Sequence, residues 1–286
     1  MRVLVIGYGF IGQGIYKGIM ERGVEAEVLS PHLSENPANK FWRGKIQDIP
    51  FIKELNLDNC IIIHTAHVGY PLHENDTLSR EIEENLQPLV DLLEHLKNYP
   101  SSRLIYISSG GAVYGEPTTS VIAETHPRNP ISYYGLCKKY MEESIKIYHK
   151  IHNLSYDILR PANVYDTNWK SSKKQGVISA LVDAALNHTS FQLWGDGKSK
   201  KDYIHLSDVV DVILKMLEKN PSNTEFNLST NKGYSINELI KIVEERYGRK
   251  IKIENQESKN QDVKSITLDN SKLRNHLSWS PDVEIR

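Results

Sequence analysis

The clearest chemistry in this sequence lies in Tyr134 and Lys138, four positions apart in a stretch with helical spacing. Side chains at positions i and i+4 project from the same face of a helix. An ammonium group beside a phenol favours the phenolate, so Lys138 is expected to lower the pKa of Tyr134 from about 10 toward the working range. Such a tyrosine can act as general acid and base for the alcohol of a sugar or a steroid.

A glycine-rich turn at the start of the chain predicts a site for a cofactor that could react with this alcohol. Gly7, Gly9 and Gly12 have the G-x-G-x-x-G spacing and follow a continuous apolar run, Val3 to Ile6. In this pattern the first glycine allows a positive φ, the second lets a pyrophosphate approach the backbone, and the third permits close packing of helix and strand. The helix that follows would direct its N-terminal N–H groups at the anion. The turn therefore predicts a dinucleotide site.

The choice between NAD and NADP stays open. NAD-binding domains of this type usually carry an acidic residue after the second strand, where it bonds the ribose 2′-hydroxyl. Here the second predicted strand, Ala26 to Leu29, leads into Ser30 and His32. Lys40 and Arg43 are possible partners for a 2′-phosphate, so both cofactors remain candidates.

The elements that must position these residues alternate along the chain. Further apolar runs predict strands at 60–65 and 103–108, a short strand begins at 41, and apolar residues at helical spacing predict helices at 78–97 and 130–151. Strands separated by helices indicate parallel βαβ units. We therefore expect an α/β fold with a doubly wound parallel sheet, a Rossmann domain, and chemistry at the carboxyl ends of its strands. Ser108 to Gly115 lies at one such end, where a serine hydroxyl could bond the substrate oxygen.

The C-terminal part predicts a smaller α/β substrate domain. Helices are expected at 176–187, 204–216 and 235–247, the last with a capping box between Ser235 and Glu238. We expect residues 1–165 to form the cofactor domain, residues 202–218 to return to it, and residues 166–286 to form mainly the substrate domain.

The composition excludes several classes of partner. The 286 residues carry a formal net charge of −1, which argues against nucleic acid or an anionic membrane as the main partner. With no long apolar run and only two cysteines, we expect a cytoplasmic protein. His64, His67 and His73 do not have the spacing of a metal site, so none is expected. The pair Glu142 and Glu143 is interpreted as a solvated helix face, and His205 as a structural hydrogen-bonding residue.

Several motifs together resemble one family, the extended short-chain dehydrogenases/reductases of the nucleotide-sugar epimerase/dehydratase group. The matching stretches span nearly the whole chain in family order: Gly-Tyr-Gly-Phe-Ile-Gly at 7–12, Ser-Ser-Gly-Gly-Ala-Val-Tyr-Gly at 108–115, Tyr134-Gly-Leu-Cys-Lys138, Leu159-Arg-Pro-Ala-Asn-Val-Tyr165, Gly195-Asp-Gly-Lys-Ser-Lys-Lys-Asp-Tyr-Ile-His205, Phe226-Asn-Leu-Ser229 and Leu277-Ser-Trp-Ser-Pro281.

The resemblance implies roles for individual residues. Tyr134 would be the proton donor and acceptor, with Lys138 bonding the nicotinamide ribose. The cofactor contacts it implies, with Ser30 added from the strand end, are Gly7, Gly9, Phe10, Ile11, Gly12, Asp48, Ile49, Ala66, Asn85, Tyr134, Lys138 and Pro161. The nucleotide-sugar contacts it implies are Asn163, Lys201 and Lys259, the lysines near the diphosphate.

The chain departs from the family pattern at several positions. The glycine spacing is one residue shorter than usual, and Gly110 stands where the family has its catalytic Ser or Thr. Ser109, one residue earlier, is our candidate for that catalytic and substrate-binding role. Lys201 and Lys259 replace arginines, which keeps the charge but loses the bidentate fork.

We interpret the chain as a nucleotide-sugar 4-epimerase that uses NAD. A reductase of 4-keto-6-deoxy nucleotide-sugars with exchangeable NAD(P)H is the alternative, and a nucleotide-binding relative without turnover is a second. A dehydratase is disfavoured, because Gly111 and Ala112 stand where those relatives carry an Asp-Glu pair. A homodimer is a family expectation.

Overall fold

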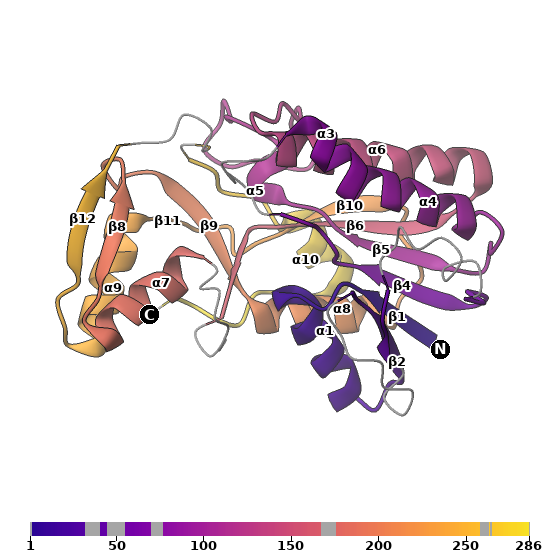
Figure 1. Cartoon of the computed structure of the whole chain (residues 1–286), viewed down its shortest axis with the longest axis horizontal. Coiled ribbons are helices and arrows are strands. Elements are labelled where there is room, and N and C mark those ends of the chain that lie inside the picture. Colours follow the sequence, from indigo (N-terminus) through magenta and orange to yellow (C-terminus); the bar gives the residue numbers. More distant parts are fainter. Residues whose placement is uncertain are drawn as a thin grey trace.

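The computed structural model describes residues 2–31, 41–44, 55–69, 77–166, 176–257, 263 and 265–285. In this described part a parallel sheet of seven strands lies between two layers of helices (Figure 1). In sheet order its strands are β10 (Thr224–Leu228), β6 (Ser155–Pro161), β5 (Arg103–Ile107), β4 (Cys60–His64), β1 (Arg2–Ile6), β2 (Ala26–Leu29) and β3 (Phe41–Trp42). The predicted doubly wound parallel fold is confirmed.

The strand order reverses at β1, which pairs with β2 on one side and with β4 on the other. The carboxyl ends of β1 and β4 therefore meet at a topological switch point, where open α/β sheets bind their ligands. The backbone there is tied together, because the N–H groups of Thr65 and Ala66 both donate to the Ile6 carbonyl, at 2.8 and 3.0 Å. The glycine turn after β1 thus lies directly beside the loop that follows β4.

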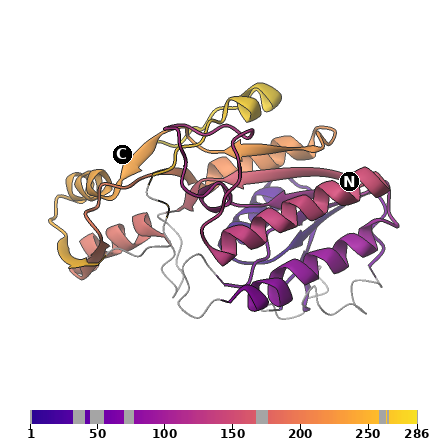
Figure 2. The ribbon, with the colours of Figure 1, turned by 90° about the horizontal axis from the view of Figure 1, so that it is seen from above.

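Helices cover both faces of the sheet (Figures 1 and 2). One face carries α1 (Phe10–Glu21), α8 (Leu206–Leu217) and α10 (Ser271–Leu277). The other carries α3 (Leu78–Glu81), the π-helical turn η2 (Ile82–Leu86), α4 (Gln87–Leu96) and α6 (Tyr133–His152), with the short α5 (Gly110–Val113) at the sheet's carboxyl edge.

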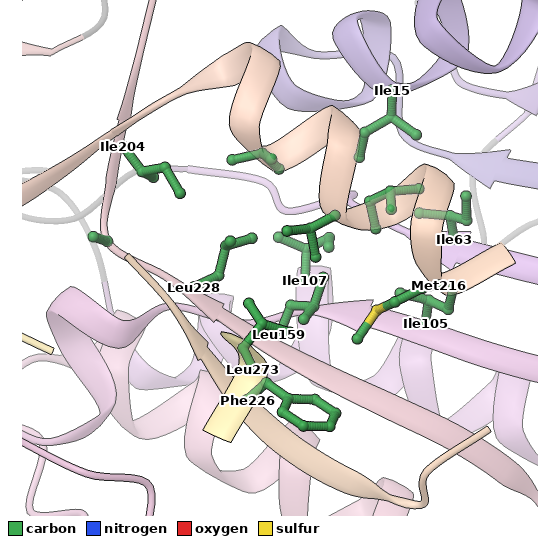
Figure 3. Close-up of a cluster of buried hydrophobic side chains, with 14 of the residues drawn as sticks. Ile15, Ile63, Ile105, Ile107, Leu159, Ile204, Met216, Phe226, Leu228 and Leu273 are labelled. Atoms are coloured by element: carbon green, nitrogen blue, oxygen red, sulfur yellow. The ribbon is translucent and has the colours of Figure 1, made fainter. Parts of the chain in front are cut away.

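The core explains why β1 is apolar at consecutive positions. Val3 and Val5 pack with Ile15 of α1 in one cluster, and Leu4 and Ile6 belong to a second cluster on the opposite face. Side chains alternate between the faces of a strand, so a strand covered on both sides needs apolar residues throughout. Figure 3 shows the first of these clusters, in which side chains from the sheet meet α1, α8 and α10.

A smaller lobe, on the left in Figure 1, has its own apolar cluster. Its elements are β7 (Asn163–Tyr165), α7 (Val177–Asn187), β8 (Ser190–Trp194), β9 (Lys200–His205), β11 (Gly233–Ser235), α9 (Ile236–Tyr247) and β12 (Lys252–Gln256). The strands form two small sheets, β11-β9-β7 and β12-β8. The predicted capping box at the start of α9 is confirmed.

Two sequence-based boundaries need correction in this part. The helix expected from residue 204 begins at Leu206, because Ile204 and His205 are the last residues of β9 and the His205 imidazole caps the helix through Ser207 N–H at 3.2 Å. The segment 202–218 divides between the lobes, because residues 202–205 lie in β9 of the smaller lobe whereas α8 packs on α1 of the large one. Further along the chain, β10 joins the main sheet and α10 packs against β10.

Candidate active site

The glycine turn after β1 leaves an open backbone surface. Gly7 has φ +97°, and an added Cβ there would lie 2.7 Å from the Ala66 nitrogen. A Cβ at Gly12 would lie 2.8 Å from Thr65 Oγ1, whereas one at Gly9 would meet no atom within 4 Å. The first and third glycines are therefore needed for close packing, and the second faces free space. Gly9 is also the N-cap of α1 and provides no side-chain cap. These features fit the pyrophosphate of a dinucleotide.

Three further predicted cofactor residues, Phe10, Ile11 and Ser30, lie at the start of α1 and at the end of β2. Phe10 and Ile11 open α1. Ser30, at the end of β2, is 3% exposed, and its N–H donates to the Trp42 carbonyl of β3 at 3.1 Å. Asp48, Ile49, His32 and Lys40 lie outside the described residues.

Helix α6 presents Tyr134 and Lys138 at the sheet's carboxyl edge. The helix begins after Ser132, whose hydroxyl accepts the Gly135 N–H at 3.1 Å. Lys138 is 2% exposed, and its ammonium donates to the Ile107 carbonyl at the end of β5, at 3.2 Å. The same nitrogen lies 5.7 Å from the centre of the Tyr134 ring. The structure therefore brings the two residues together on one helix face, as their spacing predicts.

The predicted pKa shift of Tyr134 is wrong in direction. Burial raises the pKa of Tyr134 to about 12, against a hydrogen bond with Ser109 that lowers it. Burial also lowers the pKa of Lys138 to about 8, while Cys137, Glu81 and Glu142 act in the opposite direction. A phenolate at this position would lose most of its hydration, and the Lys138 ammonium is directed at a backbone carbonyl. Tyr134 is therefore protonated at neutral pH.

Ser109 is the serine that faces Tyr134. Its side chain hydrogen-bonds to the phenol, whereas the Ser108 hydroxyl is buried and donates to Glu142 Oε1 at 2.6 Å. Position 110 has no room for a serine that could supply this hydroxyl. A Cβ there would run into the Leu268 side chain and lie 2.9 Å from the Arg160 carbonyl oxygen. The turn between β5 and α5 therefore places one hydroxyl, that of Ser109, at the tyrosine.

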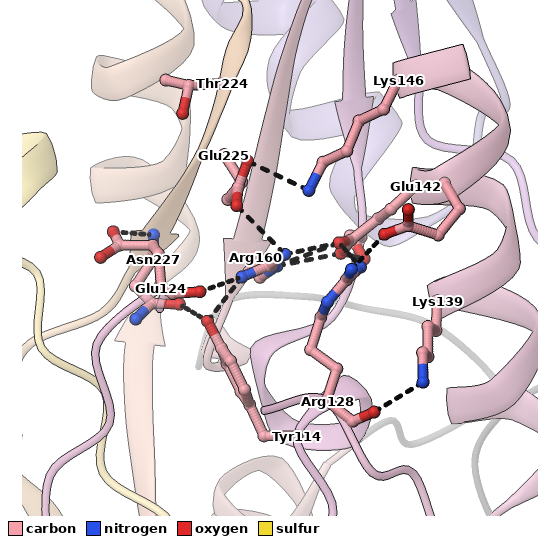
Figure 4. A network of polar contacts seen from close by, with 12 residues as sticks. Tyr114, Glu124, Arg128, Lys139, Glu142, Lys146, Arg160, Thr224, Glu225 and Asn227 are labelled. Atoms are coloured by element: carbon pink, nitrogen blue, oxygen red, sulfur yellow. Dashed lines mark hydrogen bonds and ion pairs between the residues drawn. The ribbon is translucent and has the colours of Figure 1, made fainter. Parts of the chain in front are cut away.

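A buried charge network holds α6 against the sheet (Figure 4). Glu142 is fully buried and accepts from Arg160 of β6 at 2.6 Å and from Arg128 at 2.8 Å. Arg160 also donates to the hydroxyl of Tyr114 at 2.8 Å, and Tyr114 in turn donates to Asn227 at 2.7 Å. The interpretation of Glu142 as a solvated residue is therefore wrong. Glu142 follows Lys138 by one helical turn and faces inward with it.

Two of the predicted substrate residues, Asn163 and Lys201, lie on the paired strands β7 and β9 of the smaller lobe. Asn163 is exposed on β7, and its amide donates to the Asp202 carbonyl at 3.0 Å. The Lys201 ammonium turns toward the Val263 carbonyl. Lys198 and Lys200 instead face acidic partners, Asp196 and Glu238, both at 3.7 Å. Lys259 lies outside the described residues. Pro161, the last residue of β6, precedes this group.

A model of the NAD dependent epimerase/dehydratase family matches residues 3–229. The chain belongs to this family. A protein of Methanocaldococcus jannaschii with the name "Putative UDP-glucose 4-epimerase" is 31% identical over 98% of this chain and 93% of its own length. The dTDP-4-dehydro-6-deoxyglucose reductase of Escherichia coli is 27% identical over 97% of this chain and 91% of its own length.

Solved structures of family members have the same fold. The UDP-glucose 4-epimerase of Thermus thermophilus, solved in complex with NAD, superposes with a TM-score of 0.89 at 26% identity, over 99% of this chain and 95% of that one. The UDP-glucose 4-epimerase of Thermotoga maritima, solved with UDP-glucose, superposes with a TM-score of 0.85 at 27% identity, over 99% of this chain and 94% of that one.

No helix within the described ranges is long and apolar enough to cross a membrane.

In this member of the family, the loop after β4 brings a further group to Tyr134 that the sequence analysis missed. The ring of His67 packs edge-to-face on Tyr134, with centroids 4.7 Å apart, and its Nε2 lies 3.2 Å from Glu81 Oε2. The amide of Asn85 donates to the same carboxylate at 3.0 Å, and also bonds the Val68 N–H at 2.7 Å and the Val68 carbonyl at 3.0 Å. Asn85, expected as a cofactor contact, is thus engaged in holding this loop.

One signal in the sequence pointed to this loop. His67 follows Ala66, at the carboxyl end of β4, the strand beside the switch point. The spacing of histidines in a sequence bears only on metal binding and does not predict a contact with a tyrosine. Among the described residues, no group of His, Cys, Asp or Glu side chains is arranged to hold a metal ion. No sequence pattern indicates the contact of Glu81 with His67, because it joins residues of two different elements.

Proposed function

We propose that the chain is a nucleotide-sugar 4-epimerase that binds NAD and a UDP-hexose. The observation that carries the proposal is the convergence of Tyr134, Ser109 and Lys138 beside the open glycine turn at the switch point. An alcohol bound there would meet a proton acceptor and a dinucleotide together. Similarity to epimerases along nearly the whole chain supports this choice.

The proposed steps use the chain's own residues as follows. Tyr134 takes the proton from the O4 hydroxyl of the sugar and returns it after the 4-ketose has turned over in the site. The Ser109 hydroxyl bonds the same oxygen. For Tyr134 to accept a proton, its pKa must fall from about 12 when substrate binds, and the Lys138 ammonium, 5.7 Å from the ring centre, is the positive charge that would favour the phenolate then. When bound, NAD would accept the hydride from C4 and return it to the opposite face of the sugar.

Binding is proposed to divide between the lobes. Gly7, Gly9, Phe10, Ile11 and Gly12 would hold the pyrophosphate, and Ala66, Pro161 and Ser30 would lie along the rest of the cofactor. Asn163 and Lys201 would meet the nucleotide-sugar, with Lys201 at the diphosphate.

The test compares two adjacent tyrosines of α6. Tyr134→Phe should abolish interconversion of UDP-glucose and UDP-galactose, by at least about a hundred-fold in kcat, while binding of NAD persists. Tyr133→Phe is the matched control, because Tyr133 is 49% exposed on the same helix turn, and it should keep wild-type activity. Equal activity in the two variants would remove Tyr134 from the mechanism. Full cofactor binding without turnover in the wild-type chain would favour a non-catalytic relative.

Identification of the cofactor released on denaturation separates the epimerase from the reductase. An epimerase that recycles its hydride internally should release stoichiometric NAD. A chain that releases no cofactor and binds NADPH more tightly than NAD would instead fit the reductase, to which the Escherichia coli relative is similar.

We also propose a homodimer and a cytoplasmic location. Exposed apolar side chains follow one face of α6: Tyr140, Ile147 and Ile151, which are 46%, 51% and 64% exposed. Their spacing of seven and four residues places them on one stripe, which supports pairing with the same helix of a second copy.

The two cysteines, Cys60 and Cys137, are free and buried, which supports a reducing compartment.

A further inference from the structure

His67 packs on Tyr134 and contacts Glu81, and neither residue takes part in the mechanism proposed above. We propose that His67 and Glu81 form a positioning pair for Tyr134: Glu81 fixes the imidazole of His67, and the imidazole fixes the phenol ring. The proposal rests on the proposed function, since it concerns the same tyrosine.

His67 and Glu81 join the loop after β4 to α3 beside Tyr134. Glu81 is 2% exposed at the end of α3, immediately before the π-helical turn η2. It contacts His67 Nε2 at 3.2 Å, and the His67 ring packs edge-to-face on Tyr134 at 4.7 Å. Asn85, four residues after Glu81, fixes both the carboxylate and the backbone of Val68. The loop after β4 is thus clamped to one helix while its histidine contacts the tyrosine of another.

The arrangement leaves buried polar atoms without hydrogen bonds. Among the described residues these include His67 Nδ1, His67 Nε2 and Glu81 Oε1, so the 3.2 Å contact of His67 with Glu81 is a close approach of the two groups and not a well-aligned hydrogen bond. Leaving such groups unpaired costs about 1–3 kcal/mol each. An apolar pair would pack in the same space without that cost, so stability alone does not explain these residue types.

Glu81 is charged at neutral pH and His67 is not. Although burial alone would raise the pKa of the Glu81 carboxyl, its contacts with His67 and Asn85 lower it, so the group is anionic at neutral pH. Burial, together with Lys138, lowers the pKa of His67 to about 4, so the imidazole is neutral. The Glu81 charge raises the pKa of Tyr134, opposite to the effect of a nearby ammonium. Glu81 therefore acts against ionisation of the phenol, and removing its charge should lower the pKa of Tyr134.

The test must account for every titratable group near the phenol. Those that face Tyr134 among the described residues are His67 after β4, Tyr106 on β5, Glu81 on α3, and Cys137 and Lys138 on α6. Of these, Glu81 can lose its charge with almost no change of shape, by Glu81→Gln.

Glu81→Gln should move the acidic limb of the kcat/KM profile to lower pH by about one unit. The sign follows because loss of a negative charge stabilises the phenolate, so Tyr134 deprotonates at lower pH. Glu84→Gln is the matched control, since Glu84 lies on the same helical segment but is 38% exposed and pairs with Arg80. An unchanged profile, or a shift to higher pH, would overturn the proposal.

A second readout does not depend on turnover. Ultraviolet titration of tyrosinate in the holoenzyme, taken as the difference from Tyr134→Phe, should show the same downward shift for Glu81→Gln. If the chain proves inactive as an epimerase while this shift is present, the proposed function fails and the positioning pair stands. If activity is present without the shift, the pair fails alone.

The role of the imidazole is tested separately. His67→Ala should lower kcat at least about ten-fold with little change in KM, because the phenol loses the ring that fixes it. His67→Phe keeps an aromatic edge against Tyr134 and should recover most of that loss. Wild-type kcat in His67→Ala, at unchanged thermal stability, would contradict the proposal.

Discussion

In the turn after β5, Gly110 has no side chain where the family usually has a Ser or Thr, so the hydroxyl beside Tyr134 is that of Ser109. Gly110→Ser, which would recreate the family's usual hydroxyl, should not improve catalysis. Its Cβ would collide with Leu268 and lie 2.9 Å from a carbonyl oxygen, so the variant should lose about 1–3 kcal/mol of stability. Gly111→Ser is the control, because its nearest neighbour is Asn163 Oδ1 at 3.8 Å, and it should unfold at nearly the wild-type temperature. Thermal unfolding of both variants, with kcat, checks this, and a more active Gly110→Ser would contradict it.

Residue types and spacing were sufficient to predict where the chemistry lies, but not its electrostatics. The i, i+4 relation of Tyr134 and Lys138 and the positive φ of Gly7 are local properties, and the structure has both. The pKa of Tyr134 depends on burial and on Glu81, which lies more than fifty positions away in the sequence. The residues next to Tyr134 in the sequence give no information about contacts with such distant residues.

At the scale of elements, Glu142 ties α6 to β6, and its removal should be costly. Glu142→Gln leaves the guanidinium of Arg160, which is fully buried, without its main partner. Breaking a buried ion pair in this way costs about 3–5 kcal/mol. Glu143→Gln is the matched control, because Glu143 is 45% exposed and contacts only the Arg128 side of the network, so it should cost less than about 1 kcal/mol. Denaturant unfolding of the two variants measures the difference, and equal losses would show that burial does not set the strength of this contact.

Local apolar patterns predict some strands of this fold and miss others. Apolar runs predicted β1, β4 and β5 because each is buried on both faces. The charged β9, with the pattern Lys-Lys-Asp-Tyr-Ile-His, pairs with β7 and β11, which are distant in sequence. Its apolar end was therefore assigned to the following helix. The return of β10 and α10 to the large domain likewise depends on pairing with β6, which no local pattern encodes.

At the scale of the whole molecule, the exposed stripe on α6 predicts the state of assembly. Placing a charge at its centre, in Ile147→Glu, should weaken a dimer by at least about ten-fold in Kd, because an unpaired carboxylate would be buried from both copies at once in a symmetric interface. The folded chain itself should be unaffected, since Ile147 is 51% exposed. Leu186→Glu is the control: it also replaces a half-exposed apolar residue, 49% exposed, but on α7 of the smaller lobe. Sedimentation over a range of concentrations should show dissociation for the first variant and not for the second. A wild-type chain that stays monomeric throughout, or a dimer lost only in Leu186→Glu, would move the interface away from α6.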